Sequence, residues 1–247
     1  MTPAARLQAS IEVLADIFAR RRPAADALKD WGLAHRFAGS KDRAAIASLV
    51  YDGLRRKASA SWLMGAETQR AVMLGALRTI RAMPEDEIAR LCSGDRFAPE
   101  SLSEPERARL RLAPAAALAD APAFIAGDFP EWLSPQLHRR FGDALVAEMK
   151  ALATRAPVDI RVNSLKTLRD QIRPKLAHFN PVDTPYAPMG LRFEPGEGGR
   201  GPALQATEEF QKGQFEIQDE GSQLVALLAG GEPGVGGQRE IAVHRAP

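Results

Sequence analysis

The residues best suited to chemistry stand close together in RVNSLK, residues 161–166, where a strand-like segment turns toward a helix. Arg161 and Lys166 carry cationic groups that bind phosphate oxygens, and the Asn163 amide can fix a turn or contact the edge of a base. The same residue types can also close a strand end with incidental charges. The hexamer by itself therefore indicates a nucleic-acid contact only weakly.

A second group of cations closes the first helix that the sequence predicts. In AARLQASIEVLADIFARRR the apolar residues recur at three- and four-residue spacing, and the stretch ends in Arg20, Arg21 and Arg22. The net charge is only +2, yet basic residues outnumber acidic ones in 1–60 and 131–180. Clustered positive charge can follow a phosphate backbone, and it can equally be the solvated face of Arg-rich helices.

Metal and disulfide chemistry find little support in the residue types. Cys92 is the only cysteine, which rules out an intrachain disulfide and a cysteine zinc site. A lone cysteine near a helix end, without a visible helper, is typically a small buried hydrophobe. His138 stands beside Arg139 and Arg140 with no second ligand at metal spacing, so we predict a surface or phosphate-side role. We identify no catalytic residue and no metal site.

The elements that must position these residues divide the chain in two. Helical periodicity runs through residues 1–150, and an Ala/Pro-rich stretch at 113–127 is the best candidate boundary. From Val158 the pattern changes to short strands broken by Pro and Gly, with a helix among them. We therefore predict an all-α helical bundle followed by a small α+β segment.

Composition restricts the setting of the protein. Hydrophobic residues make up 45% of the chain and charged residues 26%, which is typical of a globular protein. No apolar run approaches the length of a membrane span, and the amino terminus lacks a secretory pattern. We expect a cytoplasmic protein without a membrane partner, and the sequence leaves the oligomeric state open.

The stretch GQFEIQDEGSQLVALLAGGEPG, residues 213–234, has the pattern of a strand, a helix and a turn. Within it, Asp219 is a natural helix cap, with Glu220 in the first turn. The remaining VGGQREIAVHRAP, residues 235–247, contains a glycine pair that no hydrophobic strand precedes. We predict that these last residues are a disordered or aberrant tail.

Taken together, these segments resemble the RsmB/NOP/Sun family of RNA cytosine-5 methyltransferases. RVNSLK follows a Pro-terminated helix, and QDEGSQL follows it further along the chain. AHRFAGSKDRAAIASLVYDGLRR is similar to the NusB-like helical RNA-binding domain that precedes the methyltransferase in bacterial members, and FPEWLSPQLHRRFG is similar to the segment that joins the two parts. The resemblance covers most of residues 3–234 in consistent order.

The resemblance implies a division into four parts. Residues 1–127 would be the NusB-like RNA-binding domain and 128–157 a helical connector. Residues 158–234 would be the α+β RNA-recognition segment that leads into a Rossmann-like methyltransferase domain, and 235–247 the tail. The implied activity is methyl transfer from S-adenosylmethionine to a cytosine of ribosomal RNA, through a cysteine thiolate.

The resemblance also implies roles for particular residues. The expected RNA contacts are Arg161, Asn163 and Lys166, with Arg20, Arg21 and Arg22 as weaker candidates. Gln218, Asp219 and Ser222 are expected near the methionine or ribose end of the cofactor, although capping is an equally good role for Asp219.

The sequence departs from the family pattern after the helix expected at 220–229. No D-x-C-A-G-x-G-G-K motif follows, and neither do the two Cys-bearing motifs that lie further on in the family. Cys92 belongs to the helical part and cannot replace the missing nucleophile. We therefore expect a truncated, amino-terminal portion of such an enzyme, which binds RNA, binds no cofactor and transfers no methyl group. The alternative is a non-enzymatic NusB-type RNA-binding or antitermination module, which would not carry the segment after Val158.

Overall fold

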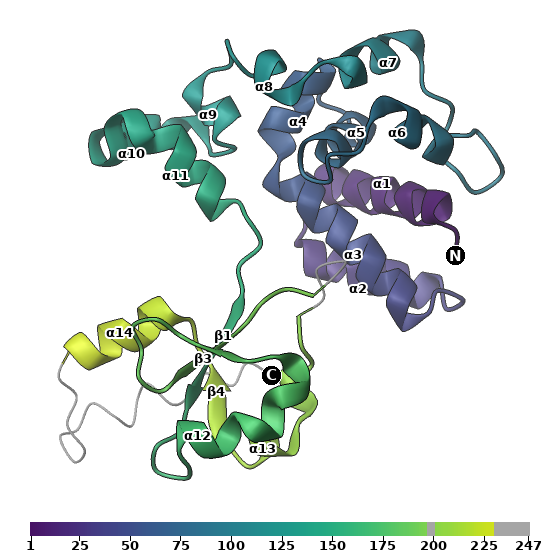
Figure 1. Cartoon of the computed structure of the whole chain (residues 1–247). Helices are drawn as coiled ribbons and strands as arrows, with labels where there is room; N and C mark the ends of the chain where they lie inside the picture. The colour runs from purple at the N-terminus through teal and green to yellow at the C-terminus, as the bar shows by residue number, and fades with distance from the viewer. Residues whose placement is uncertain (197–200, 230–247) are drawn as a thin grey trace. The chain divides into compact units, whose positions relative to one another are not determined.

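The computed structural model describes residues 1–196 and 201–229, and it separates into two compact units (Figure 1). Residues 1–154 form a helical unit, and the α+β unit begins at Arg155. The predicted tail at 235–247 lies outside the described residues. No helix among the described residues is long and apolar enough to cross a membrane.

The helical unit contains helices of very different lengths. The α-helices are α1 (Pro3–Arg20), α2 (Ala24–Ala34), α3 (Ser40–Arg55), α4 (Lys57–Met64), α5 (Gln69–Thr79), α6 (Glu85–Leu91), α7 (Glu104–Arg111), α8 (Pro114–Ala117), α9 (Ala123–Ala126), α10 (Ser134–Phe141) and α11 (Leu145–Leu152). Short 3-10 helices, η1 (Glu131–Leu133) and η2 (Gly142–Ala144), flank α10.

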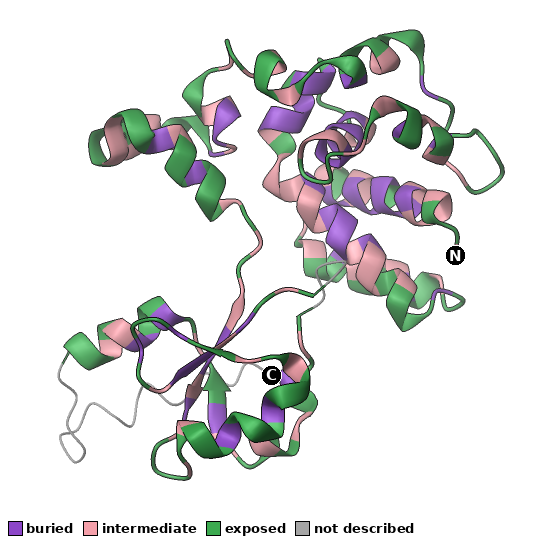
Figure 2. Ribbon diagram, viewed as in Figure 1, coloured by how far each residue is buried: buried purple, intermediate pink, exposed green. Residues whose placement is uncertain are grey.

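Helix α1 shows how sequence specifies these elements. The Thr2 hydroxyl accepts a hydrogen bond from the backbone N–H of Ala5, and Pro3 occupies the first turn, where it needs no hydrogen-bonded N–H. Leu7 and Leu14 lie on the buried face, and the helix ends where Arg21 adopts a left-handed conformation. Buried side chains of α1, α3 and α5 form one apolar core (Figure 2).

Helices α4 and α5 pack with their backbones close together. A Cβ atom at Gly75 would stand 2.6 Å from the carbonyl oxygen of Ala60. The absence of a side chain at this position therefore allows the approach.

The segment after the Ala/Pro-rich stretch is anchored to α4 by one buried carboxylate. Asp128 has a φ of 54° and accepts hydrogen bonds from the Ser59 backbone N–H (2.8 Å) and hydroxyl (2.6 Å). Arg56 lies 3.5 Å from the same carboxylate. Beyond it, Phe129, Leu145 and Met149 form a small apolar cluster of their own. By their contacts, α10 and α11 thus belong to the helical unit, and the finer domain boundaries stay predictions.

The α+β unit is built on a four-stranded sheet. Its strands are β1 (Val158–Val162), β2 (Val182–Asp183), β3 (Gly190–Phe193) and β4 (Phe215–Ile217); its helices are α12 (Arg169–Ile172), η3 (Pro174–Phe179), η5 (Leu204–Ala206), α13 (Glu208–Gln211) and α14 (Glu220–Leu228). The strand order is β2-β3-β1-β4, and every neighbouring pair is antiparallel. This order, with helical segments after β1 and after β3, is the βαββαβ arrangement of ferredoxin-like folds.

The two faces of this sheet differ in character. Alternation in β1 places Ile160 and Val162 in an apolar cluster with Phe193, Phe215 and the residues of α12 and η3. The other face carries Asp159, which pairs in register with Arg192 of β3. The predicted succession of a helical bundle and an α+β segment is thus confirmed. The NusB-like identity of the bundle and the start of a Rossmann-like sheet stay predictions.

Candidate functional site

Asn163 fixes the turn that follows β1. Its side-chain amide donates a hydrogen bond to the Gly213 carbonyl (3.1 Å), and its side-chain oxygen accepts one from the Leu165 N–H (3.1 Å). Its backbone carbonyl also accepts a hydrogen bond from the N–H of Lys166. Of the two roles considered for this amide, the turn-forming one is therefore present in the structure.

Lys166 and Arg161 are placed differently. The Lys166 ammonium donates a hydrogen bond to the Lys212 carbonyl (2.8 Å), at the same turn that Asn163 contacts. Arg161 lies opposite Glu216 in the β1–β4 register, and the two charged groups stand 3.9 Å apart in a partly exposed pair. The structure thus joins Asn163 and Lys166 at one turn, whereas Arg161 holds only a loose ion pair.

The cations at the end of α1 are partly neutralised within the helical unit. Arg20 pairs with Asp16 at 2.9 Å, and Arg22 pairs with Asp16 at 3.3 Å and with Asp30 at 2.5 Å. The hydrogen bond from Arg22 lowers the pKa of the Asp30 carboxyl. Arg21 is exposed, in the left-handed conformation that ends the helix.

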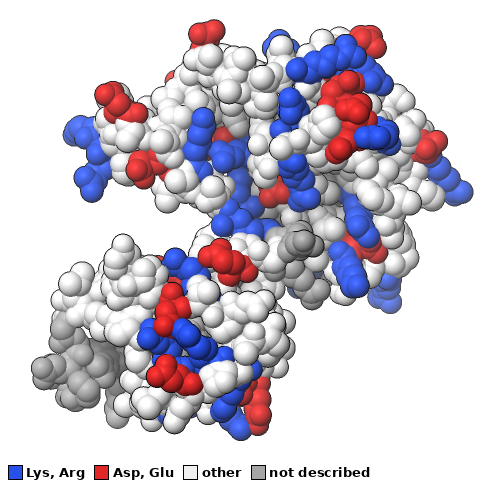
Figure 3. Space-filling model, viewed as in Figure 1, with Lys and Arg blue, Asp and Glu red and all other residues white. Residues whose placement is uncertain are grey.

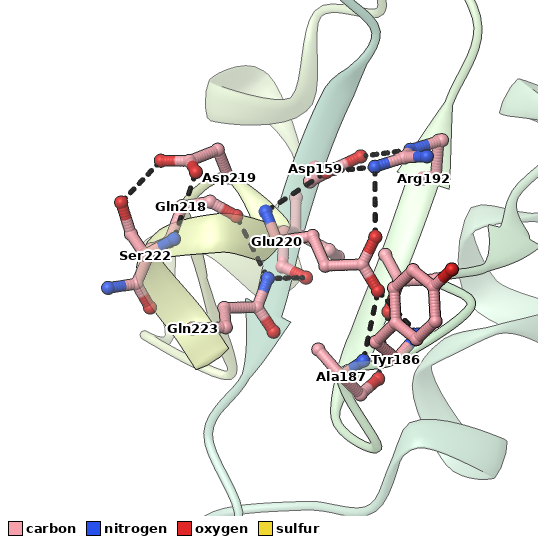
Figure 4. A network of polar contacts seen from close by, with 11 residues as sticks. Asp159, Tyr186, Ala187, Arg192, Gln218, Asp219, Glu220, Ser222 and Gln223 are labelled. Carbon is pink, nitrogen blue, oxygen red and sulfur yellow. Dashed lines mark hydrogen bonds and ion pairs between the residues drawn. The ribbon is translucent and has the colours of Figure 1, made fainter. Parts of the chain in front are cut away.

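A buried charge network joins α14 to the polar face of the sheet (Figure 4). Arg192 donates two hydrogen bonds of 2.8 Å to the Asp159 carboxylate and one of 3.2 Å to Glu220. Glu220 also accepts the backbone N–H groups of Tyr186 (2.6 Å) and Ala187 (3.0 Å). The hydrogen bonds to Asp159 raise the pKa of Arg192 further above its ordinary value. The carboxylates of Asp159 and Glu220 are only 4% and 9% exposed, so the network is a shielded one.

Because of this network, α14 turns polar residues toward the sheet. Glu220 and Gln223 are buried, and the Gln223 amide donates hydrogen bonds to the carbonyls of Ile160 (3.2 Å) and Gln218 (2.9 Å). Three large apolar residues of the same helix are exposed, namely Val225, Leu227 and Leu228, whereas Leu224 is half-buried. An amphipathic helix ordinarily does the reverse. The outer face of α14 is thus an apolar surface.

Two of the residues expected near a cofactor, Asp219 and Ser222, hydrogen-bond to each other at the start of α14. The Asp219 carboxylate accepts hydrogen bonds from the Ser222 N–H (2.9 Å) and the Ser222 hydroxyl (2.5 Å), which lower the pKa of Asp219. The Gln218 side-chain oxygen is buried with no hydrogen-bond partner among the described residues. The expected position of Gln218, Asp219 and Ser222 near a cofactor stays a prediction, whereas the capping hydrogen bonds of Asp219 are present in the structure. Capping is therefore the role that Asp219 performs here.

Cys92 and His138, the remaining candidates, lie in different surroundings. Burial raises the pKa of the Cys92 thiol to about 11, which opposes formation of a nucleophilic thiolate. His138 lies exposed near the end of α10. Within the described ranges, no group of three or more His, Cys, Asp or Glu could hold a metal ion.

Sequence reasoning missed Asp159 and Arg192, and it gave Glu220 only a place in the first helical turn. The first two alternate with apolar neighbours in VDIRV and GLRFE, a pattern typical of half-buried strands that indicates no partner for either charge. The usable signal was weak: two opposite charges stand on strands that pair in the sheet. Only the register identified them as partners.

Comparison with known proteins agrees with this architecture. The family model described as "Methyltr_RsmF/B-like, ferredoxin-like domain" matches residues 129–196. The chain is 32% identical over 108 residues to the "Probable ribosomal RNA small subunit methyltransferase B" of Synechocystis sp.. That match covers 42% of this chain and 23% of the relative, so the aligned part is less than a quarter of the relative's length.

A solved structure shares the fold across nearly the whole chain. The structure titled "Crystal Structure of PH0851" aligns with a TM-score of 0.53 and 16% sequence identity, covering 95% of this chain and 57% of that one. Residues 129–196 thus match an RsmF/B-like ferredoxin-like domain, and the fold is similar to a solved structure over nearly the whole chain. The resemblance to the RsmB/NOP/Sun family is thereby confirmed.

Proposed function

We propose that this chain is the RNA-binding portion of an S-adenosylmethionine-dependent methyltransferase that modifies cytosine in ribosomal RNA. The observation that carries the proposal is the βαββαβ unit, whose strand order fits the ferredoxin-like domain matched at residues 129–196. The name of the Synechocystis relative supports ribosomal RNA as the substrate class.

The outer face of α14 supports an enzymatic context. Val225, Leu227 and Leu228 present apolar surface that a monomeric protein ordinarily covers. In our proposal this face packs against the cofactor-binding part of the enzyme. The buried network of Asp159 and Glu220 then fixes the angle at which α14 meets that part.

The 247-residue chain binds RNA without transferring a methyl group in this proposal. Its single cysteine is buried with a raised pKa, and Asp219 and Ser222 hydrogen-bond to each other at the start of α14. The test is incubation of the purified chain with radiolabelled S-adenosylmethionine and ribosomal RNA. Label transferred to RNA above the level of a protein-free control would contradict the inactivity that we propose.

The candidates for RNA contact differ in how firmly other groups of the protein hold their side chains. Arg161 can exchange its loose pair with Glu216 for a phosphate, because the two groups are 3.9 Å apart and partly exposed. Asn163 and Lys166 act by holding the turn beside it. Arg21 is exposed and forms no ion pair among the described residues, whereas Arg20 and Arg22 need to give up aspartate partners.

Salt dependence separates these roles. We expect Arg161→Ala to lower the log-log slope of RNA affinity against salt by about one unit, as one lost phosphate contact does. Arg90→Ala is a matched control, because Arg90 is also an arginine in a long pair, 3.8 Å from Asp86. An equal slope for the two variants would assign Arg161 to the structure alone.

The second candidate is a non-enzymatic NusB-type module. The ordered sheet after Val158 argues against it, since such a module has no need of this unit. Removal of residues from Arg155 onward decides between them. RNA affinity that stays unchanged after this removal would favour the NusB-type function.

A further inference from the structure

The corner between α2 and α3 carries a short stack of aromatic rings that ends in solvent. The ring of His35 lies 4.2 Å from that of Trp31 in a stacked geometry, and the ring of Phe37 meets His35 edge-on at 5.8 Å. Trp31 and His35 are half-buried, whereas Phe37 is 73% exposed. A single exposed apolar side chain is ordinary on a protein surface, but this exposed ring extends a stack of two partly buried rings.

Hydrogen bonds hold this corner in one conformation. The His35 ring Nδ1 lies 2.8 Å from the Trp31 carbonyl, and the Ala38 N–H donates to the His35 carbonyl at 3.0 Å. Ala38 is buried, and its own carbonyl accepts a hydrogen bond from Arg43 Nε at 2.9 Å. Phe37 therefore stands between two fixed neighbours, which reduces the entropy lost when a ligand stacks on it.

The corner between α2 and α3 carries cations that its local ion pairs do not neutralise. Asp30 forms an ion pair with Arg22, and Asp42 forms one with Arg6 at 2.8 Å. Besides Arg43, which donates to the Ala38 carbonyl, the cations that remain without a carboxylate partner among the described residues are Lys29, Arg36 and Lys41. All three are exposed, and Figure 3 shows basic side chains over this end of the helical unit.

We propose that this corner binds single-stranded RNA, with a base stacked on Phe37 and phosphates held by Arg36, Lys41 and Lys29. An exposed ring offers any base a flat apolar face, and cations around it suit the phosphates on either side. A protein partner fits less well, because the three unpaired cations would lose water against a mostly apolar contact. The site rests on the proposed RNA function and adds a contact in the helical unit.

Replacement of the ring tests the stacking. We expect Phe37→Ala to weaken binding of a short fluorescein-labelled single-stranded RNA roughly tenfold, as loss of one stacked base does, and Phe37→Trp to restore it. Phe97→Ala is the matched control, because Phe97 is 64% exposed in the same unit and also has an arginine beside it, with Arg96 at 5.0 Å. It should leave affinity unchanged. Tryptophan fluorescence during unfolding verifies that the variants keep their fold.

Replacement of the cations tests the phosphates. Arg36→Gln with Lys41→Gln should lower the salt slope by about 1.4, at about 0.7 for each contact to a single strand. If the unsubstituted chain binds the probe and Phe37→Ala behaves like Phe97→Ala, the inference fails and the proposed function stands. If the unsubstituted chain binds no RNA, both are overturned.

Discussion

Buried carboxylates have different roles in the two units. In the helical unit the core is apolar, and Asp128 accepts hydrogen bonds from the backbone N–H and the hydroxyl of Ser59 in α4. In the α+β unit Asp159 and Glu220 lie between the sheet and α14, in the place where an apolar interface is usual. Apolar packing therefore determines the first unit, and charge geometry determines where α14 lies on the second.

This difference matters because the two kinds of contact fail differently. An apolar contact weakens gradually as surface is lost, whereas a buried charge without its partner costs its full desolvation. Charge geometry also selects one position, since three groups must meet at hydrogen-bonding distance. All three tryptophans, Trp31, Trp62 and Trp132, lie in the helical unit. Tryptophan fluorescence therefore reports on that unit alone, and hydrogen exchange can report on the other.

The largest effect is expected from Arg192→Leu. It leaves Asp159 and Glu220 buried without a cation and should cost about 3 kcal/mol, at the lower end for a broken buried pair because the arginine is partly exposed. Hydrogen exchange should quicken in β1, β3 and α14, with tryptophan fluorescence unfolding unchanged. Arg161→Leu, on the same sheet with a loose pair, is the control. Equal exchange in the two variants would remove the distinction drawn between the units.

A smaller cost is expected from Asp128→Ala in the helical unit. The Ser59 N–H loses its acceptor, and alanine tolerates the left-handed conformation poorly, so about 2 kcal/mol should be lost. Urea unfolding followed by tryptophan fluorescence measures it. Asp128→Asn keeps an acceptor oxygen and a residue suited to that φ, and it should recover most of the loss. A full loss with asparagine would mean that the charge beside Arg56 dominates.

Gly75→Ala should cost about 1 kcal/mol net. The new methyl group would overlap the backbone of Ala60, which costs ~1–3 kcal/mol, and the gain in helix propensity offsets about 1 kcal/mol. Gly53→Ala is the control, since the nearest atom there is the flexible end of Leu14 at 3.2 Å. We expect it to be neutral or stabilising in the same urea experiment. Equal destabilisation by both would show that close α4–α5 packing is not special.

The smallest effect concerns the cap of α14 and its pH dependence. The Ser222 hydroxyl lowers the pKa of Asp219 in the folded protein. The ionised carboxylate therefore contributes stability above the pKa of the unfolded state, about 3.9, and this stability is lost as the pH falls through the lower pKa of the folded state. A pH titration of the Ser222 amide signal by NMR should have its midpoint below ~3.9. Asp219→Asn should abolish that transition. A midpoint at or above the ordinary aspartate value would show that the cap is not formed in solution.

Much of the fold could be predicted from local patterns. Apolar spacing in α1 and the change of period at Val158 are local signals, and a helix and a strand formed there. The site was less predictable. Asn163 was recognised as polar and turn-forming, yet its partner Gly213 lies 50 residues away, and no local pattern encodes that pairing.

The sequence by itself determined a helical part, a later α+β part and a family resemblance, because periodicity, capping residues and motifs are local properties of a chain. Only the tertiary structure decided that Asp159, Arg192 and Glu220 form one network and that α14 turns its polar side inward. Strand register and burial decide such facts, since they determine which distant charges meet and which lose water. The tertiary structure also decided that Arg161 pairs with Glu216 and that Lys166 donates a hydrogen bond to the Lys212 carbonyl.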